Sequence, residues 1–235
     1  MISSFKLHSN LKKKGTVAIL TILATLSLVS CGQSQTKTPE AKVESSTPVK
    51  QVSTTQNSPT LENLEKAYNG ESNAHVMYLA FAKKADEEGY KEVANLFRAA
   101  AQAEAIHRDN HAKVIEAMGG TPKNNITTPE VKSTKENLET AIKGESYERD
   151  TMYPEFISQA KAEKNQAAVQ TLTYAQAAEA QHAKLYAEAE NNLESWRTET
   201  HPFYVCKASG ETAIDKTAMA QCPTVASGES YIEVN

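Results

Sequence analysis

The sequence is poor in residues that interrupt helices. Only nine glycines and eight prolines occur among its 235 residues, and runs rich in Ala, Glu, Lys and Leu lie between them. Strand-like segments are scarce, which argues against a fold that alternates strands with helices. The composition therefore predicts an all-α body.

The apolar run near the N-terminus is too short to span a membrane. Residues 16–29 form a run of 14 residues, whereas a transmembrane helix needs ~20. Lys6 and the lysines of 12–14 precede this run, which is typical of an export signal. Leu28-Val29-Ser30-Cys31 resembles the lipobox of bacterial lipoproteins, in which the cysteine is lipidated and becomes the new N-terminus. The alternative is an uncleaved anchor with an incidental Cys31. Both readings place the body outside the cytoplasmic membrane, and the lipobox predicts a lipid-anchored protein of the bacterial cell envelope.

Basic residues are outnumbered once the signal is removed. Residues 1–30 hold four lysines and no acidic residue, so the remaining chain has 21 basic and 29 acidic side chains, a formal balance of −8. Such an acidic surface argues against a nucleic-acid partner. Residues 31–59 are rich in Ser, Thr, Gln, Lys and Pro, which is typical of a disordered tether. We therefore expect a lipoprotein signal peptide in 1–30, a tether in 31–59, and membrane contact through the lipid.

The predicted body, residues 60–197, contains an internal repeat. The segment 63–72 matches 137–146, and a Glu-x-x-His sequence follows each copy at nearly equal distance. The two sequences are Glu104-x-x-His107 and Glu179-x-x-His182. Such pairs, with a further Glu from each of two other helices, build two-metal sites inside four-helix bundles.

The chain between these motifs predicts where the helices end. The midpoints of the two repeats fall at 88–90 and at 162–165, where we expect the turns of two helical hairpins. Ser133-x-x-Glu136 is a capping box that opens a helix. The 15 residues of 119–133 exceed the ~2 to 8 that join neighbouring antiparallel helices. We therefore predict a long crossover and a ferritin-like four-helix bundle.

Each predicted helix carries an apolar stripe that glutamate interrupts near its middle. The glutamates concerned are Glu71, Glu104, Glu145, Glu148 and Glu179. Brought together in a low-dielectric interior they would repel one another, and each unpaired charge would cost several kcal/mol. Two divalent cations would offset this repulsion, and five carboxylates with two imidazoles suit iron or manganese. The alternative is that some of these glutamates face solvent.

Residues 60–195 resemble the ferritin-like domain of the rubrerythrin family. The matching motifs are Gly70-Glu71, Glu104-x-x-His107, Gly144-Glu145-x-x-Glu148 and Glu179-x-x-His182. The resemblance implies two iron ions, with manganese possible. The resemblance implies five ligands that stay bound to the metals throughout: Glu71, Glu104, Glu145, Glu179 and His182. It also implies that His107 and Glu148 alternate as ligands of one metal. Tyr78 and Tyr153 would lie beside the metals, either in a redox role or as core aromatics that bond a carboxylate. We expect His75 and His111 to be hydrogen-bonded core histidines.

The tail, residues 198–235, resembles a degenerate rubredoxin-like domain. Residues 204–210 and 222–226 resemble its two knuckles, but a tetrathiolate iron site needs Cys-x-x-Cys twice. Ser209 and Val225 stand where the second cysteines would be, so we expect no rubredoxin-type iron. If the small fold persists, Cys206 and Cys222 would face each other, and outside the cytoplasm we expect them to form a disulfide.

The resemblance implies a peroxidase that reduces hydrogen peroxide in defence against oxidative stress. With the rubredoxin-type iron lost, an external electron donor, which the sequence does not identify, would have to serve. Two alternatives remain open: a surface-tethered ferroxidase or iron/manganese-binding protein whose metal ions are its cargo, and a lipoprotein in which metals only hold the bundle together. The resemblance also implies a homodimer.

Overall fold

The computed structural model describes residues 58–235 except 199–200, 220–221 and 226–227. The predicted signal peptide, Cys31 and nearly all of the predicted tether lie outside the described residues. Across the part of the chain that is described, no helix combines the length and the apolar character that crossing a membrane requires.

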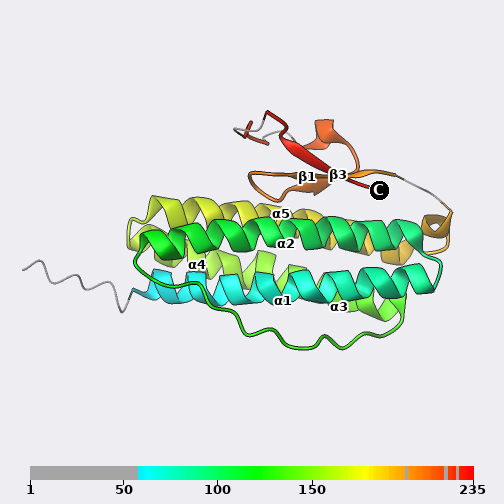
Figure 1. The fold of residues 1–235 in the computed structure, drawn as a ribbon, viewed down its shortest axis with the longest axis horizontal. Coiled ribbons are helices and arrows are strands. Elements are labelled where there is room, and N and C mark those ends of the chain that lie inside the picture. The colour runs from blue at the N-terminus through cyan, green and yellow to red at the C-terminus, as the bar shows by residue number, and fades with distance from the viewer. Residues whose placement is uncertain (1–57, 199–200, 220–221, 226–227) are drawn as a thin grey trace, which may run out of the picture. The chain divides into compact units, whose positions relative to one another are not determined.

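Four long helical stretches lie side by side (Figure 1). Three of them are single helices: α1 (Pro59–Glu87), α2 (Lys91–Ala117) and α5 (Gln166–Asn191). The other consists of α3 (Thr134–Tyr147), the π-helical segment η2 (Glu148–Met152) and α4 (Tyr153–Ala162). The predicted helical body is therefore confirmed. It begins at Pro59, one residue before the predicted start, because the Ser58 side chain accepts a hydrogen bond from the Leu61 N–H and caps the helix.

The turns lie where the repeat predicts them. Gly89, with φ of 81°, separates α1 from α2, and Lys164, with φ of 58°, separates α4 from α5. Ser133 and Glu136 form the predicted capping box at the start of α3. The crossover from α2 to α3 runs back along the bundle (Figure 1). Asn69 and Asn73 on α1 hold it through hydrogen bonds to the backbone of Asn125 and Thr127.

The third helical stretch is not regular α-helix throughout. The chain widens into a π-helical segment at Glu148–Met152, directly after the Glu145-x-x-Glu148 motif. Pro154, at the start of α4, has no N–H to donate and its ring crowds the carbonyl four residues earlier, which disfavours regular α-helical hydrogen bonding. The Tyr153 N–H bonds instead to the Glu148 carbonyl, five residues back. Gln176 of α5 donates to the Arg149 carbonyl of this segment at 3.0 Å.

Two apolar clusters fill the bundle. One contains Leu61, Leu64, Ile115, Phe156 and Leu172. The other contains Phe81, Leu96, Phe97, Leu138 and Tyr186, and includes Phe203 and Val205 of the tail. Along α1, α2 and α5, the residues of these clusters are separated by the predicted metal ligands. The polar site therefore lies between two apolar cores.

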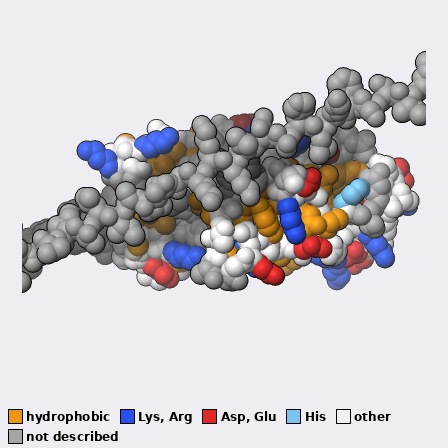
Figure 2. Space-filling view, turned by 90° about the horizontal axis from the view of Figure 1, so that it is seen from above, with side chains coloured by type: hydrophobic (Ala, Val, Ile, Leu, Met, Phe, Trp, Pro, Cys, Tyr) orange, Lys and Arg blue, Asp and Glu red, His pale blue; other side chains and the backbone are white. Residues whose placement is uncertain are grey.

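The tail forms a small antiparallel sheet against the bundle. Its strands are β1 (Phe203–Cys206), β2 (Thr212–Ala213) and β3 (Tyr231–Val234), in the order β2-β1-β3. Short 3₁₀ segments, η3 (Ser195–Arg197) and η4 (Lys216–Ala218), flank it. Strand β1 contacts α2, and β2 contacts α5. Figure 2 looks onto this side, where basic and acidic side chains are interspersed around exposed apolar ones. The likeness of this sheet to a rubredoxin-like domain stays a prediction.

Candidate metal centre

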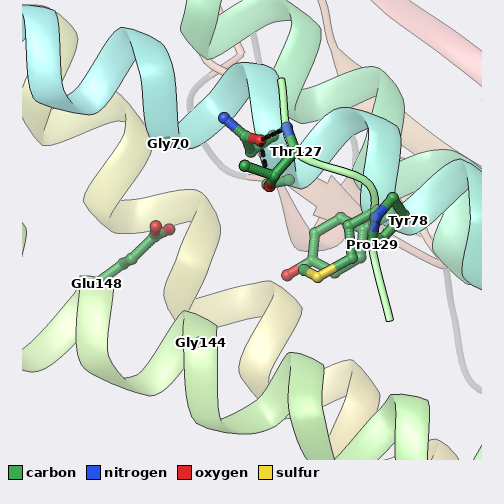
Figure 3. A pocket seen from close by; sticks show the side chains of 9 residues that line it. Gly70, Tyr78, Thr127, Pro129, Gly144 and Glu148 are labelled. Atoms are coloured by element: carbon green, nitrogen blue, oxygen red, sulfur yellow. Dashed lines mark hydrogen bonds between the residues drawn. The ribbon is translucent and has the colours of Figure 1, made fainter. Parts of the chain in front are cut away.

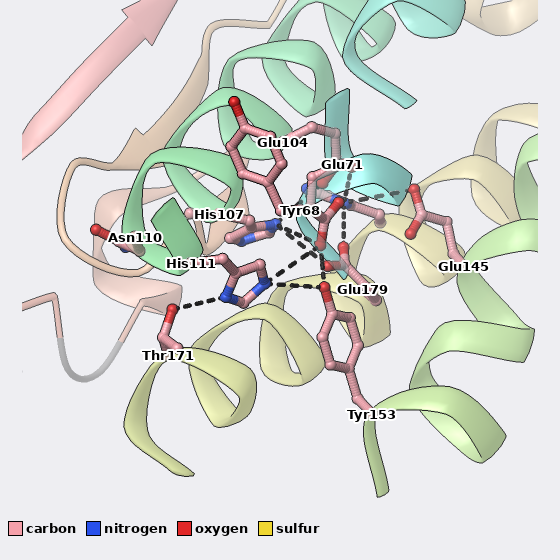
Figure 4. A network of polar contacts seen from close by, with 12 residues as sticks. Tyr68, Glu71, Glu104, His107, Asn110, His111, Glu145, Tyr153, Thr171 and Glu179 are labelled. Carbon is pink, nitrogen blue, oxygen red and sulfur yellow. Dashed lines mark hydrogen bonds and ion pairs between the residues drawn. The ribbon is translucent and has the colours of Figure 1, made fainter. Parts of the chain in front are cut away.

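Six of the seven predicted metal ligands come together in the middle of the bundle, and Figure 4 labels five of them, all except His182. They form two groups in which one ligand atom of every member lies within 4.8 Å of the others. The groups are Glu71, Glu104, His107 and Glu179, and Glu104, Glu145, Glu179 and His182. Glu104 and Glu179 belong to both groups, so each of the two could help to hold either of two metal ions.

Helix geometry explains why these six side chains meet. Residues three apart lie on one face of an α-helix, so Glu104 and His107 of α2 point inward together, as do Glu179 and His182 of α5. Helix α1 adds Glu71, and α3 adds Glu145 at the matching repeat position. All six side chains are at least 99% buried, so four of the five glutamates do not face solvent. The seventh predicted ligand, Glu148, is half-buried and belongs to neither group.

The inner nitrogens of both histidines face carboxylates. Nδ1 of His107 lies 3.0 Å from Glu104 and 3.2 Å from Glu179. Nδ1 of His182 lies 2.9 Å from Glu179 and 3.6 Å from Glu145. Each Nδ1 therefore points to the space in which a metal would be shared with these oxygens.

The tail holds the outer nitrogens of the same two rings. Nε2 of His107 lies 3.0 Å from the carbonyl oxygen of Ser209, and Nε2 of His182 lies 3.0 Å from the hydroxyl oxygen of Thr212. The Thr212 hydroxyl donates to the Gly210 carbonyl, so it is free to accept from His182. With both Nε2 atoms bound as N–H donors, each Nδ1 is the nitrogen that can give up its proton and bind a metal.

The buried polar atoms fit a pair of cations. Several have no hydrogen-bond partner among the described residues: Oε2 of Glu71, Oε1 of Glu104, Oε2 of Glu145, both carboxylate oxygens of Glu179 and Nδ1 of His182. Buried polar atoms are normally paired, because an unpaired one costs free energy. Four carboxylates and two imidazoles form a donor set suited to iron or manganese. These six residues are therefore our candidate ligands.

The protein alone perturbs the protonation of this cluster. Burial, followed by the negative charge of Glu104, raises the pKa of Glu71, and burial with the charge of Glu179 raises the pKa of Glu145 to about 8. Burial opposes ionisation of Glu104 too, but its contacts with His107 and His182 outweigh it and lower the pKa of Glu104. Burial likewise disfavours the charged form of His107, but Glu179 and Glu104 raise its pKa to about 10. Without metals, protons must offset the repulsion among these carboxylates.

Both predicted tyrosines bond to candidate ligands. The Tyr78 hydroxyl donates to Oε1 of Glu145 at 2.5 Å, and the Tyr153 hydroxyl donates to Oε1 of Glu71. Nε2 of His111 lies 3.3 Å from the Tyr153 hydroxyl, while its Nδ1 lies 2.9 Å from the Thr171 hydroxyl. Burial and the positive charge of His107 lower the pKa of His111 to about 3, so it is neutral. His111 is thus a hydrogen-bonded core histidine, and half-buried His75 bonds through Nδ1 to the Ala101 carbonyl.

The tail contains the disulfide expected between Cys206 and Cys222, and it also makes contacts that the sequence did not indicate. Cys206 and Cys222 are joined by a disulfide, which ties β1 to the segment before β3. Ser209, which stands in place of a knuckle cysteine, presents its carbonyl to His107. Gly210 follows with φ of 77°, and a Cβ atom there would lie 2.2 Å from Nε2 of His107. No periodic pattern in the sequence could have predicted these contacts. The one local signal is Gly210, because a glycine lets another group approach the backbone closely.

The chain matches one family and several solved structures. The family model described as Rubrerythrin matches residues 62–190. Nigerythrin from Nitratidesulfovibrio vulgaris is 41% identical over 152 residues, which are 64% of this chain and 74% of that protein. Rubrerythrin-2 from Clostridium acetobutylicum is 33% identical over 171 residues, 71% of this chain and 91% of that protein.

The structural matches agree with those of the sequence. A structure of fully reduced, all-ferrous nigerythrin matches with a TM-score of 0.63 and 37% identity, covering 74% of this chain and 90% of that one. Bacterioferritin from Mycobacterium tuberculosis matches with a TM-score of 0.54 and 20% identity, covering 60% and 89% of the two chains. The second match bears on the fold alone, and it supports the ferritin-like arrangement of the helices.

Proposed function

Because the chain belongs to the rubrerythrin family, we propose that it is a non-haem di-iron oxidoreductase that reduces hydrogen peroxide. The observation that carries this proposal is the buried group of four carboxylates and two imidazoles, in which several carboxylate oxygens have no hydrogen-bond partner among the described residues. Two adjacent ferrous ions, when bound, would supply the two electrons that peroxide reduction needs and stabilise the leaving oxygen as Lewis acids.

The side chains of the chain itself hold and orient the ligands. Glu104 and Glu179 lie between the two histidines and set where the two metals would bind. Tyr78 and Tyr153 fix one oxygen each of Glu145 and Glu71 by hydrogen bonds. The apolar cores on both sides keep bulk water away from the ligands, which strengthens the electrostatic interactions inside the site. Re-reduction would require an external electron donor.

Stopped-flow oxidation tests the proposal. The anaerobically reduced protein should bind two iron ions per chain, and peroxide should oxidise it at least about 10-fold faster than the same concentration of oxygen, a difference in barrier of about 1.4 kcal/mol. Two bound irons with no preference for peroxide would contradict the proposal and favour a ferroxidase instead.

A matched pair of variants tests the ligands separately. Glu104→Gln removes a carboxylate shared by both groups, so its iron content should fall below one per chain. Glu116→Gln changes an exposed glutamate on the same helix and should keep two irons per chain. Equal loading of the two variants would exclude Glu104 as a ligand.

A further inference from the structure

A cavity of about 210 Å³ opens at the surface between α1, α3 and the crossover (Figure 3). Glu148 and Tyr78 line it. The Tyr78 hydroxyl bonds to Glu145, a candidate ligand, so the cavity ends one side chain from the metal centre. Figure 3 shows the Glu148 carboxylate pointing across the cavity toward the helix that carries Gly70.

Two glycines from the two halves of the repeat also line this cavity. Gly70 lies within α1 and Gly144 within α3. A glycine inside a helix costs roughly 0.5–1 kcal/mol relative to alanine. Neither glycine has the positive φ that would require it. The backbone therefore does not explain why both positions are glycine.

Packing does not explain these glycines either. A Cβ atom at Gly144 would meet nothing within 4 Å, and at Gly70 it would meet only Oε1 of Glu148, at 3.9 Å. The other described glycines differ, because each either has positive φ or, as at Gly120, would bring its Cβ within 3.0 Å of a neighbour. A side chain at Gly70 or Gly144 would therefore extend into the cavity.

The other walls of the cavity are small or fixed. Ala74 on α1 stands at the repeat position of Glu148, so a small side chain replaces a second carboxylate there. Asn73 holds the crossover in place, because its Oδ1 accepts hydrogen bonds from the N–H and the hydroxyl of Thr127 at 2.9 and 3.0 Å. The cavity is therefore bordered by a small side chain on α1 and by a crossover that hydrogen bonds hold in place.

We infer that this cavity is the port through which hydrogen peroxide reaches the metal centre, and that Gly70 and Gly144 hold it open. The inference rests on the proposed function. A cavity of this volume accommodates a molecule slightly larger than water, whose share of liquid volume is about 30 Å³. The port is lined by Glu148, the predicted ligand that lies outside both ligand groups.

Gly144→Ala and Ala74→Leu narrow the port from opposite walls. Each should slow peroxide oxidation of the reduced protein by about 5-fold or more, since atoms added to a confined space raise the barrier to entry. Each should also slow the association of azide, a small anion that reports access without turnover, with the oxidised iron-loaded protein. Iron content should remain at two per chain.

Thermal unfolding separates the port from a general effect on folding. Gly144→Ala should raise Tm by about 2–4 °C, because alanine favours the helix, while both rates fall. The control is Thr140→Ala, an exposed position one turn earlier on α3, which should leave both rates unchanged. Unchanged peroxide and azide rates in Gly144→Ala and Ala74→Leu would overturn the inference. If peroxide does not oxidise even the unaltered protein, the proposed function fails, and slower azide association in the two variants would still support the port.

Discussion

Glu148 differs from the other predicted ligands in its surroundings. It stands three residues after Glu145, yet it lies outside both ligand groups and lines the cavity instead. Burial, and then the negative charge of Glu145, raises the pKa of Glu148, so in the metal-free protein it favours its neutral form. This placement suits a side chain that binds a metal in only one oxidation state, as the family resemblance implies.

Replacing Glu148 tests that role. Glu148→Gln should keep two irons per chain, because six ligands remain, but should slow peroxide oxidation by about 10-fold or more, as expected when a charged group that acts during the reaction is lost. Stopped-flow absorbance and iron analysis measure the two effects. Glu155→Gln, which changes an exposed glutamate on α4, is the control. An unaltered oxidation rate in Glu148→Gln would remove this residue from the mechanism.

At the scale of elements, the loop between β1 and β2 acts on both histidines at once. The Ser209 carbonyl and the Thr212 hydroxyl bond to their outer nitrogens. The Thr212 N–H also bonds to Gln181 of α5 at 2.7 Å, and the disulfide of Cys206 fixes the start of the loop. The tail therefore positions the two histidines among the candidate ligands.

Thr212→Val removes the hydroxyl at nearly constant volume. We expect it to weaken metal binding about 10-fold or more, because outer partners of ligand histidines commonly contribute that much, while the helical circular dichroism is unchanged. Titration of the metal-free protein with Co²⁺ against a competing chelator gives the affinity. Thr217→Val, at an exposed position of the same tail, should bind Co²⁺ normally. Equal affinities for both variants would show that the loop only covers the site.

Local sequence patterns predicted most of the helices and turns. The features that these patterns did not predict depend on contacts between residues far apart in the sequence. The turn at Gly89, the capping box at Ser133 and the length of the crossover are properties of short segments, so they could be read directly. The π-helical segment could have been suspected from Pro154, but its extent depends on packing against Gln176 of α5. The contacts of His107 and His182 with the tail span 102 and 30 residues, and no periodicity encodes them.

At the scale of the whole molecule, the metal centre sets how stability depends on pH. The pKa of Glu145 is about 8 in the folded protein and about 4.3 in an unfolded chain. A proton bound more tightly in the folded state stabilises it fully below the unfolded pKa, and this contribution is lost as pH rises through about 8. His107, with a pKa of about 10 against about 6.5 unfolded, loses its contribution as pH rises through about 10. His111 changes charge only below about 6.5, because its folded pKa is about 3.

The metal-free protein should therefore lose stability as pH rises from 6.5 to 9. We expect its Tm to fall by about 5 °C or more over this range, and we expect Glu145→Gln to reduce the fall, because glutamine does not titrate. Glu139→Gln, at an exposed position on α3, should keep the full fall. Metal binding displaces the same protons, so the Tm difference between loaded and metal-free protein should widen toward pH 9. A metal-free Tm that is constant or rises with pH would mean that the carboxylates do not share one buried site, because their burial and mutual repulsion in that site give the dependence this sign.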